Sequence, residues 1–118
     1  MEEIRDELEQ AFREGYVYGI GDKRRTDAMI KQIADHYGLE QLQIAMEECT
    51  ELNLAILKLK RGWSEKRQKN IVEEIADTLI MVLQLRYIFG ADKVDEVITQ
   101  KLVRQLERIE EEQSHDDR

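Results

Sequence analysis

The sequence contains no proline and only six glycines in 118 residues. Average proline usage is about 5%, so a chain of this length would ordinarily contain about six prolines. Because proline and glycine interrupt helices, their scarcity predicts long helices, as does the abundance of Glu, Leu, Ile, Lys, Arg and Gln. The predicted fold class is therefore all-α, without a sheet, in a single domain of residues 1–118.

Cysteine and long apolar runs are also scarce. The single cysteine, Cys49, excludes an internal disulfide and is typical of a reducing compartment. No cationic segment followed by an apolar run opens the chain, so we expect no secretion signal. The longest apolar run, residues 79–83, is far shorter than the roughly 20 residues that a membrane span requires. We expect a cytoplasmic protein with no membrane partner.

The charge balance is acidic. Eighteen Lys and Arg stand against 26 Asp and Glu, which gives a formal net charge of −8. A negative surface repels the phosphate backbone of nucleic acids, so we expect no nucleic-acid partner. The net charge does not exclude a local basic patch.

Apolar spacing predicts five helical segments along the chain. Gly38 and Gly90 are expected to end helices, and Thr26, Ser64 and Asp92 to cap the helices that follow them. The predicted helices are 2–14, 26–37, 39–60, 64–89 and 92–110, with a flexible connection at 15–25 and a polar, frayed tail at 111–118.

Two of these helices carry long apolar sets. In the third, steps of three and four predict a packing seam with a buried Cys49 thiol, formed by Leu42, Ala45, Cys49, Leu52, Ile56 and Leu59. In the fourth, residues 79–83 are apolar on every side, which predicts burial all round. One small subunit can hardly supply that burial, so we expect oligomerisation through the fourth helix. The last helix is expected to bury Val94, Ile98, Leu102, Leu106 and Ile109.

Four acidic residues adjoin these apolar seams. Glu48 and Glu51 lie one turn apart on the third helix, and Glu74 and Asp77 repeat that spacing on the fourth. If the two helices face each other as a central antiparallel pair, the four carboxylates gather in one pocket. Such oxygen ligands suit Mg²⁺, or Mn²⁺, shared with substrate phosphates. The alternative is that they are ordinary charges on the solvated faces of Glu-rich helices.

Other site types find less support. A di-iron bundle needs Glu-x-x-His on two helices, and neither His36 nor His115 follows a glutamate at that spacing. Gly19-Ile20-Gly21 lacks the Lys-Ser/Thr ending of a phosphate loop. The last helix carries a basic stripe that could hold phosphate oxygens, or could simply pair with neighbouring glutamates: Lys101, Arg104 and Arg108. Trp63 could stack on a base or could be a packing residue.

The ordered set of motifs resembles the MazG-like all-α nucleoside triphosphate pyrophosphohydrolases. The resemblance covers roughly residues 39–109 and leaves residues 1–38 as an N-terminal helical extension. It comprises Glu48-x-x-Glu51 within Met46–Leu52, Glu74-x-x-Asp77 within Ile71–Asp77, and the stretch from Lys101 to Arg108.

The resemblance implies hydrolysis of a nucleoside triphosphate to the monophosphate and pyrophosphate with Mg²⁺, in a dimer or tetramer. It makes Lys101 a phosphate contact and implies four metal ligands, which are Glu48, Glu51, Glu74 and Asp77. Gln105 stands where relatives often carry an asparagine that positions the nucleotide. Glu47, beside the cluster, is a candidate for the base that orients water. The base and sugar of the nucleotide are not specified.

A different class of function is a non-catalytic helical module that binds partners through the same scaffold. A nucleotide or metal sensor is a third hypothesis, which predicts binding without product formation. The presence of all four carboxylates favours the enzyme, since a decayed site should have lost at least one.

Overall fold

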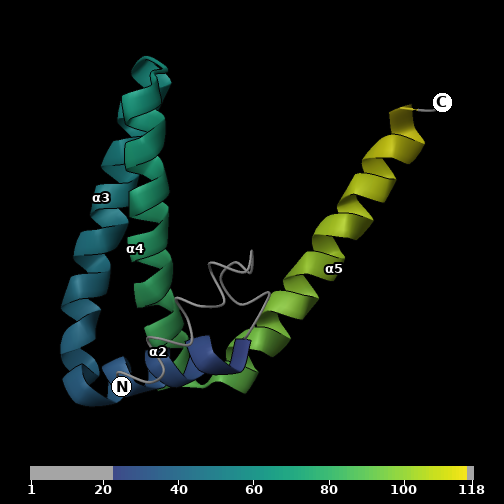
Figure 1. Cartoon of the computed structure of the whole chain (residues 1–118). Helices are drawn as coiled ribbons and strands as arrows, with labels where there is room; N and C mark the ends of the chain where they lie inside the picture. Colours follow the sequence, from purple (N-terminus) through teal and green to yellow (C-terminus); the bar gives the residue numbers. More distant parts are fainter. Residues whose placement is uncertain (1–22, 117–118) are drawn as a thin grey trace. The chain divides into compact units, whose positions relative to one another are not determined.

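The structure is a computed structural model that describes residues 23–116, and its regular structure is entirely helical (Figure 1). No strand occurs in this part of the chain, which confirms the all-α fold class. None of its helices is both long and apolar enough to cross a membrane. The predicted helix over 2–14 lies outside the described residues. The described elements are α2 (Lys23–Tyr37), the short 3-10 helix η1 (Gly38–Glu40), α3 (Gln41–Arg61), α4 (Glu65–Phe89) and α5 (Ala91–Asp116).

The chain divides into two compact units, Met1–Ile88 and Phe89–Arg118. The first holds α2, η1, α3 and nearly all of α4, and the second holds α5. That residues 1–118 form a single domain stays a prediction.

Helix boundaries agree with the sequence except at four ends. Helix α3 begins at Gln41, two residues after its predicted start, because Gly38–Glu40 form the 3-10 helix η1. Helix α2 begins at Lys23, so Thr26 is a buried residue inside the helix and not its cap.

Helix α5 begins at Ala91, so Asp92 lies in its first turn and is not its cap. The Val94 amide donates a hydrogen bond to the Gly90 carbonyl at this end. Helix α5 continues to Asp116, past its predicted end at residue 110, so residues 111–116 of the predicted frayed tail are helical, and residues 117–118 lie outside the described part of the chain. After Gly90 no proline or glycine interrupts the helix, and its glutamates and glutamines are good helix formers.

The predicted helix ends at the glycines are confirmed. Helices α2 and α4 end immediately before Gly38 and Gly90, whose φ angles of 64° and 114° are rare for residues with a side chain. The Ser64 cap is confirmed as well, since its Oγ accepts a hydrogen bond of 3.1 Å from the Arg67 amide.

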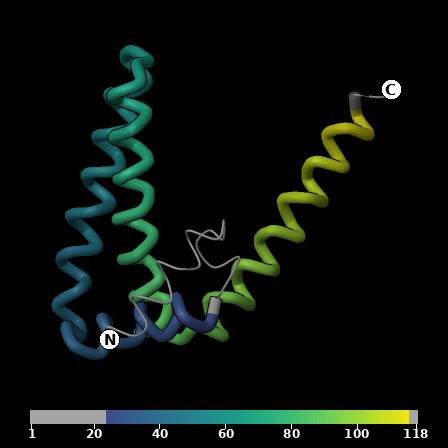
Figure 2. Tube along the Cα trace, in the orientation of Figure 1, coloured from purple at the N-terminus to yellow at the C-terminus, as the bar shows by residue number. Residues whose placement is uncertain are grey.

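Helices α3 and α4 form a hairpin through residues 62–64 (Figure 2). Near its open end, Gln41 at the start of α3 donates a 2.7 Å hydrogen bond to Gln84 toward the end of α4. Further along, the Thr78 hydroxyl donates to the backbone carbonyl of Glu48 over 3.1 Å. These bonds set which residues of the two helices face each other. That this pair is the centre of a larger bundle stays a prediction.

The observed seam of α3 confirms three of the six predicted residues, Ala45, Leu52 and Leu59. The other three, Leu42, Cys49 and Ile56, are exposed, so the buried thiol was a wrong prediction. The neighbouring residues Gln41, Glu48 and Ala55 take their places at the same steps of three and four, and the small alanines of the seam allow close helix approach. The members of the seam are Gln41, Ala45, Glu48, Leu52, Ala55 and Leu59, of which Glu48 and Leu52 are half-buried and the others buried.

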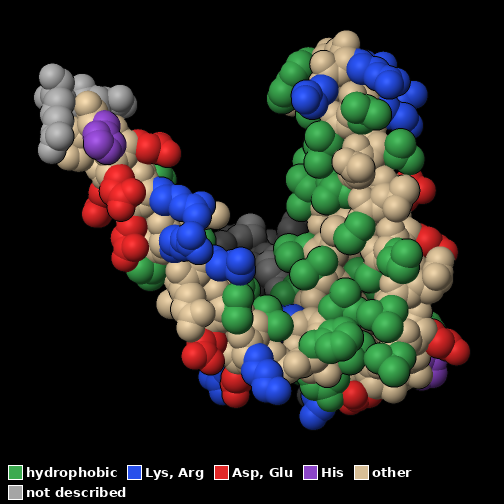
Figure 3. Space-filling model, turned by 180° about the vertical axis from the view of Figure 1, so that it is seen from behind, with side chains coloured by type: hydrophobic (Ala, Val, Ile, Leu, Met, Phe, Trp, Pro, Cys, Tyr) green, Lys and Arg blue, Asp and Glu red, His purple; other side chains and the backbone are tan. Residues whose placement is uncertain are grey.

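Complete burial of residues 79–83 is not reached within the single chain. Met81 is buried, but Leu79, Ile80 and Val82 are exposed. Figure 3 shows apolar side chains spread over one face of the α3–α4 hairpin. Burial of the apolar set on α5 was also wrong for the single chain, since Val94 is half-buried and the rest are exposed: Ile98, Leu102, Leu106 and Ile109. Association through α4 stays a prediction.

Candidate functional site

Glu48 enters the helix seam because of its register on α3. It follows Ala45 by three residues and precedes Leu52 by four, so its side chain points toward α4 with them. The hydrogen bond from Thr78 to the Glu48 carbonyl holds α4 against this turn of α3. That contact brings the preceding turn of α4, with Glu74 and Asp77, opposite the Glu48 carboxylate.

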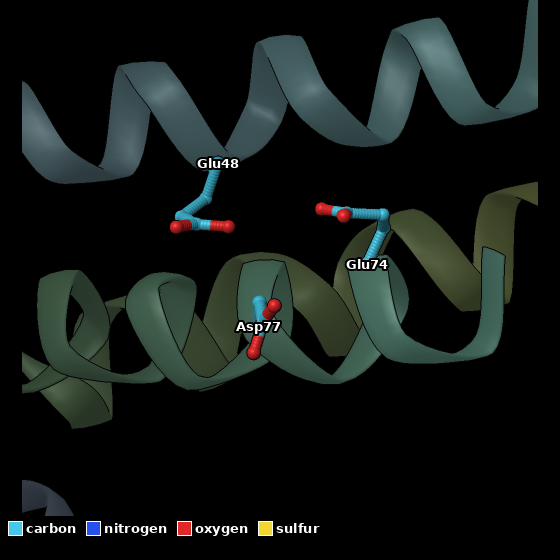
Figure 4. Close-up of side chains that lie close together, drawn as sticks. All are labelled: Glu48, Glu74 and Asp77. Carbon is cyan, nitrogen blue, oxygen red and sulfur yellow. The ribbon is translucent and has the colours of Figure 1, made fainter. Parts of the chain in front are cut away.

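Three carboxylates meet at this level of the hairpin (Figure 4). One oxygen from each of Glu48, Glu74 and Asp77 lies within 4.8 Å of the other two. In Figure 4 the Glu48 and Glu74 side chains extend from their own helices into the space between α3 and α4. Glu48 and Glu74 are half-buried, whereas Asp77 is exposed and opens the cluster to solvent. We refer to these three residues as the acidic cluster.

Glu74 is the most constrained member of the acidic cluster. Its Oε2 atom is buried and has no hydrogen-bond partner in the described part of the chain. Burial is the largest influence that raises its pKa above the ordinary 4.5, followed by repulsion from the carboxylates of Asp77, Glu51, Glu48 and Glu73. A buried acceptor without a donor costs free energy, so this arrangement needs a proton or a cation to be stable.

The donor set fits a hard divalent cation. Carboxylate oxygens are the ligands that Mg²⁺, Mn²⁺ and Ca²⁺ prefer. Two oxygens bound to one Mg²⁺ lie at most about 4.2 Å apart, because each bond is about 2.1 Å long. The oxygens of the acidic cluster lie within 4.8 Å of one another, which is close to this limit.

Two predicted residues of α3 lie outside the acidic cluster. Glu51 is exposed and is not among the three converging carboxylates, although its charge helps to raise the pKa of Glu74. Glu47 is exposed too, and its Oε1 accepts a 3.3 Å hydrogen bond from Gln43, one turn earlier on the helix. Since consecutive residues of a helix diverge by about 100°, Glu47 points away from Glu48.

The other predicted site residues lie elsewhere in the chain. Trp63 is 72% exposed in the connection between α3 and α4. The predicted phosphate-binding and nucleotide-positioning residues of α5 are all exposed and belong to the second unit, so their approach to the acidic cluster stays a prediction. They are Lys101, Arg104, Gln105 and Arg108.

Sequence reasoning missed Thr78 as a residue that positions the site. A signal was present, since Thr78 is the one polar residue between Asp77 and the apolar run 79–83. Its partner is a backbone carbonyl of another helix, and no side-chain pattern encodes such a bond.

Comparison with family models, with curated proteins and with solved structures finds no match to this chain. The resemblance to the MazG-like family therefore rests on the residues quoted above.

Proposed function

We propose that this protein is a metal-dependent nucleoside triphosphate pyrophosphohydrolase of the MazG-like kind, acting in the cytoplasm. The observation that carries the proposal is the convergence of Glu48, Glu74 and Asp77 across the α3–α4 seam, with one Glu74 oxygen buried and without a hydrogen-bond partner among residues 23–116. A half-buried group of carboxylates without a cation among them is costly as a purely structural feature. It is well suited to bind a divalent cation that a triphosphate shares.

In this proposal the acidic cluster binds the cation and orients the triphosphate. When bound, Mg²⁺ or Mn²⁺ supplies the positive charge that stabilises phosphate oxygens during in-line attack. Water attacks the α-phosphorus, the bond to the bridging oxygen breaks, and pyrophosphate leaves. Asp77, as the exposed member, lies on the side from which substrate arrives. Glu51, one turn from Glu48, is the fourth proposed ligand.

The basic stripe of α5 completes the proposed site. Lys101, Arg104 and Arg108 follow one another at spacings that align them on one helix face, where they would neutralise the phosphate chain. Association through the exposed apolar residues of α4 into a homodimer or tetramer would bring further helices to the acidic cluster. Gln105 and Trp63 are the proposed contacts to the nucleoside.

The decisive experiment is to measure pyrophosphate release from a panel of NTPs and dNTPs, with Mg²⁺ and with a chelator. We expect release of pyrophosphate and not orthophosphate, only with the metal, and the ranking of substrates would identify the base. Replacing Glu74 with Gln should lower turnover by about a hundredfold or more, because it removes one charged ligand from a shared metal site.

A matched control is Glu73→Gln, which removes the same charge from an exposed neighbour of the acidic cluster. We expect turnover within about twofold of wild type, since Glu73 is not among the converging carboxylates. Equal losses in both variants would contradict the metal-site proposal. Nucleotide binding without pyrophosphate release would instead favour the sensor module.

A further inference from the structure

The closed end of the α3–α4 hairpin is strongly basic in an otherwise acidic chain. Residues 58–69 contain one carboxylate, Glu65, and six cations: Lys58, Lys60, Arg61, Lys66, Arg67 and Lys69. All six cations are exposed. Figure 3 shows Lys and Arg side chains gathered at this end of the hairpin on the visible face. Because the whole chain carries −8, this end is an exception to the surface charge and offers a place for an anion.

A pocket of about 460 Å³ lies within this basic end. Its lining among the described residues consists of three cations and two neutral polar side chains: Lys58, Lys66, Arg67, Ser64 and Asn70. Helix α3 contributes Lys58, and the connection and α4 contribute the other four. No carboxylate of the described chain lines the pocket, so its cations converge without internal neutralisation.

The backbone holds one of these cations in place. Arg67 Nη1 donates a 2.7 Å hydrogen bond to the carbonyl of Gly62, and the Arg67 amide donates to the Ser64 capping oxygen. A Cβ atom on residue 62 would lie 2.7 Å from the same Nη1 atom. Gly62 is therefore the residue that leaves room for the guanidinium. The other nitrogens of Arg67 remain available as donors to a ligand.

Members of the pocket and of the acidic cluster share one face of α4. Arg67, Asn70 and Glu74 follow one another at steps of three and four. Two turns separate Arg67 from Glu74, about 10 Å along the helix axis, and the Arg67 guanidinium is held toward Gly62, away from Glu74. The pocket is therefore distinct from the acidic cluster and can receive an anion that leaves it.

We propose that this pocket binds a polyphosphate anion through Lys58, Lys66 and Arg67. Pyrophosphate is the smallest such anion, and its charge near neutral pH matches three converging cations. In the proposed hydrolase, and this part rests on that proposed function, the pocket receives the departing pyrophosphate. The fixed Arg67 guanidinium suits two phosphate oxygens at once.

The test is calorimetric binding of inorganic pyrophosphate to the full chain in the presence of a chelator. Replacing Lys58 and Arg67 together with Gln should weaken binding about tenfold or more, because both remove charge-assisted contacts. The matched control replaces Lys60 and Lys69 with Gln, which removes the same charge from the same end outside the pocket. The control should weaken binding less than about twofold.

Two outcomes would overturn the pocket. One is an equal loss in both double variants, which would indicate a diffuse charge effect. The other is no pyrophosphate binding by the wild-type chain. Gly62→Ala gives a finer test, since it keeps every charge but displaces the Arg67 guanidinium. It should weaken pyrophosphate binding several-fold and leave the melting temperature nearly unchanged, whereas wild-type affinity would contradict the role of Arg67.

Pyrophosphate binding by the pocket can be tested separately from nucleotide hydrolysis by the acidic cluster. Glu74→Gln should still bind pyrophosphate in chelator, so the pocket can be right even if no nucleotide is hydrolysed. If nucleotides are hydrolysed, the Lys58/Arg67 double variant should weaken product inhibition by pyrophosphate but leave inhibition by the monophosphate unchanged. An equal effect on the monophosphate would contradict a pocket for pyrophosphate, while the proposed hydrolase would stand.

Discussion

Two groups of polar side chains cross the seam between α3 and α4, and their hydrogen bonding differs. Gln84 is only 1% exposed, yet its Oε1 accepts from Gln41 and its Nε2 donates to the sulfur of Met81. Two turns away, the acidic cluster gathers like charges, and Glu74 Oε2 has no partner in the described part of the chain. The glutamine pair satisfies itself, as a structural contact should. The acidic cluster does not, which is typical of a site completed by a ligand.

The largest expected difference between the two groups is in their response to metal. With Mn²⁺ at about a hundred times its Kd, wild-type protein should gain about 2.7 kcal/mol in its free energy of unfolding. Asp77→Asn should lose most of this gain, because a cluster ligand is gone. Gln41→Ala should keep it. Thermal unfolding with Mn²⁺ and with chelator measures both, and an unchanged gain in Asp77→Asn would contradict the metal site.

Without metal, the variant of the glutamine pair should lose more free energy of unfolding than the variant of the acidic cluster. Gln41→Ala leaves the buried Gln84 Oε1 without its donor, which should cost about 1–3 kcal/mol. Glu74→Gln removes a charge repelled by its neighbours and should leave the apo protein at least as stable as wild type. Urea unfolding in chelator measures the two changes. A strongly destabilised Glu74→Gln would mean that the acidic cluster is structural.

The smallest expected difference is in pH dependence. Burial and the neighbouring carboxylates raise the pKa of Glu74 in the folded state, so the folded protein binds more protons just above pH 4.5 than the unfolded chain. The contribution of Glu74 to stability is therefore retained below this value and is lost as pH rises through the folded pKa. Glu74→Gln should flatten that decline in chelator, and Gln41→Ala should not. A decline of equal slope in Glu74→Gln would assign the dependence to other groups.

Helix positions were predictable because local chemistry sets them. The absence of proline, the glycines at 38 and 90 and the Ser64 cap act over a few residues, and the observed ends of α3 and α4 follow them closely. The errors at Thr26 and Asp92 have the same origin. A capping residue is also compatible with the first turns of a helix, so its type alone does not set the helix start.

The seam was less predictable because two sets of α3 residues share one spacing. Ala45, Leu52 and Leu59 belong to both sets. At the other positions larger side chains favoured Leu42, Cys49 and Ile56, yet Gln41, Glu48 and Ala55 face α4. Small residues permit close helix approach, and the Gln41–Gln84 and Thr78–Glu48 bonds are compatible with this register. The shift moved Glu48 from beside the seam into it.

The sequence by itself determined that this chain is helical and where α3 and α4 begin and end, because propensities, caps and breakers are local. It also indicated which carboxylates could meet, through the repeated spacing of Glu48-x-x-Glu51 and Glu74-x-x-Asp77. Only the tertiary structure decided which of them converge, which Glu74 oxygen is buried, and that Lys58 and Arg67 share a pocket. The reason is that these features depend on the rotation of one helix against another, and contacts between distant residues set that rotation.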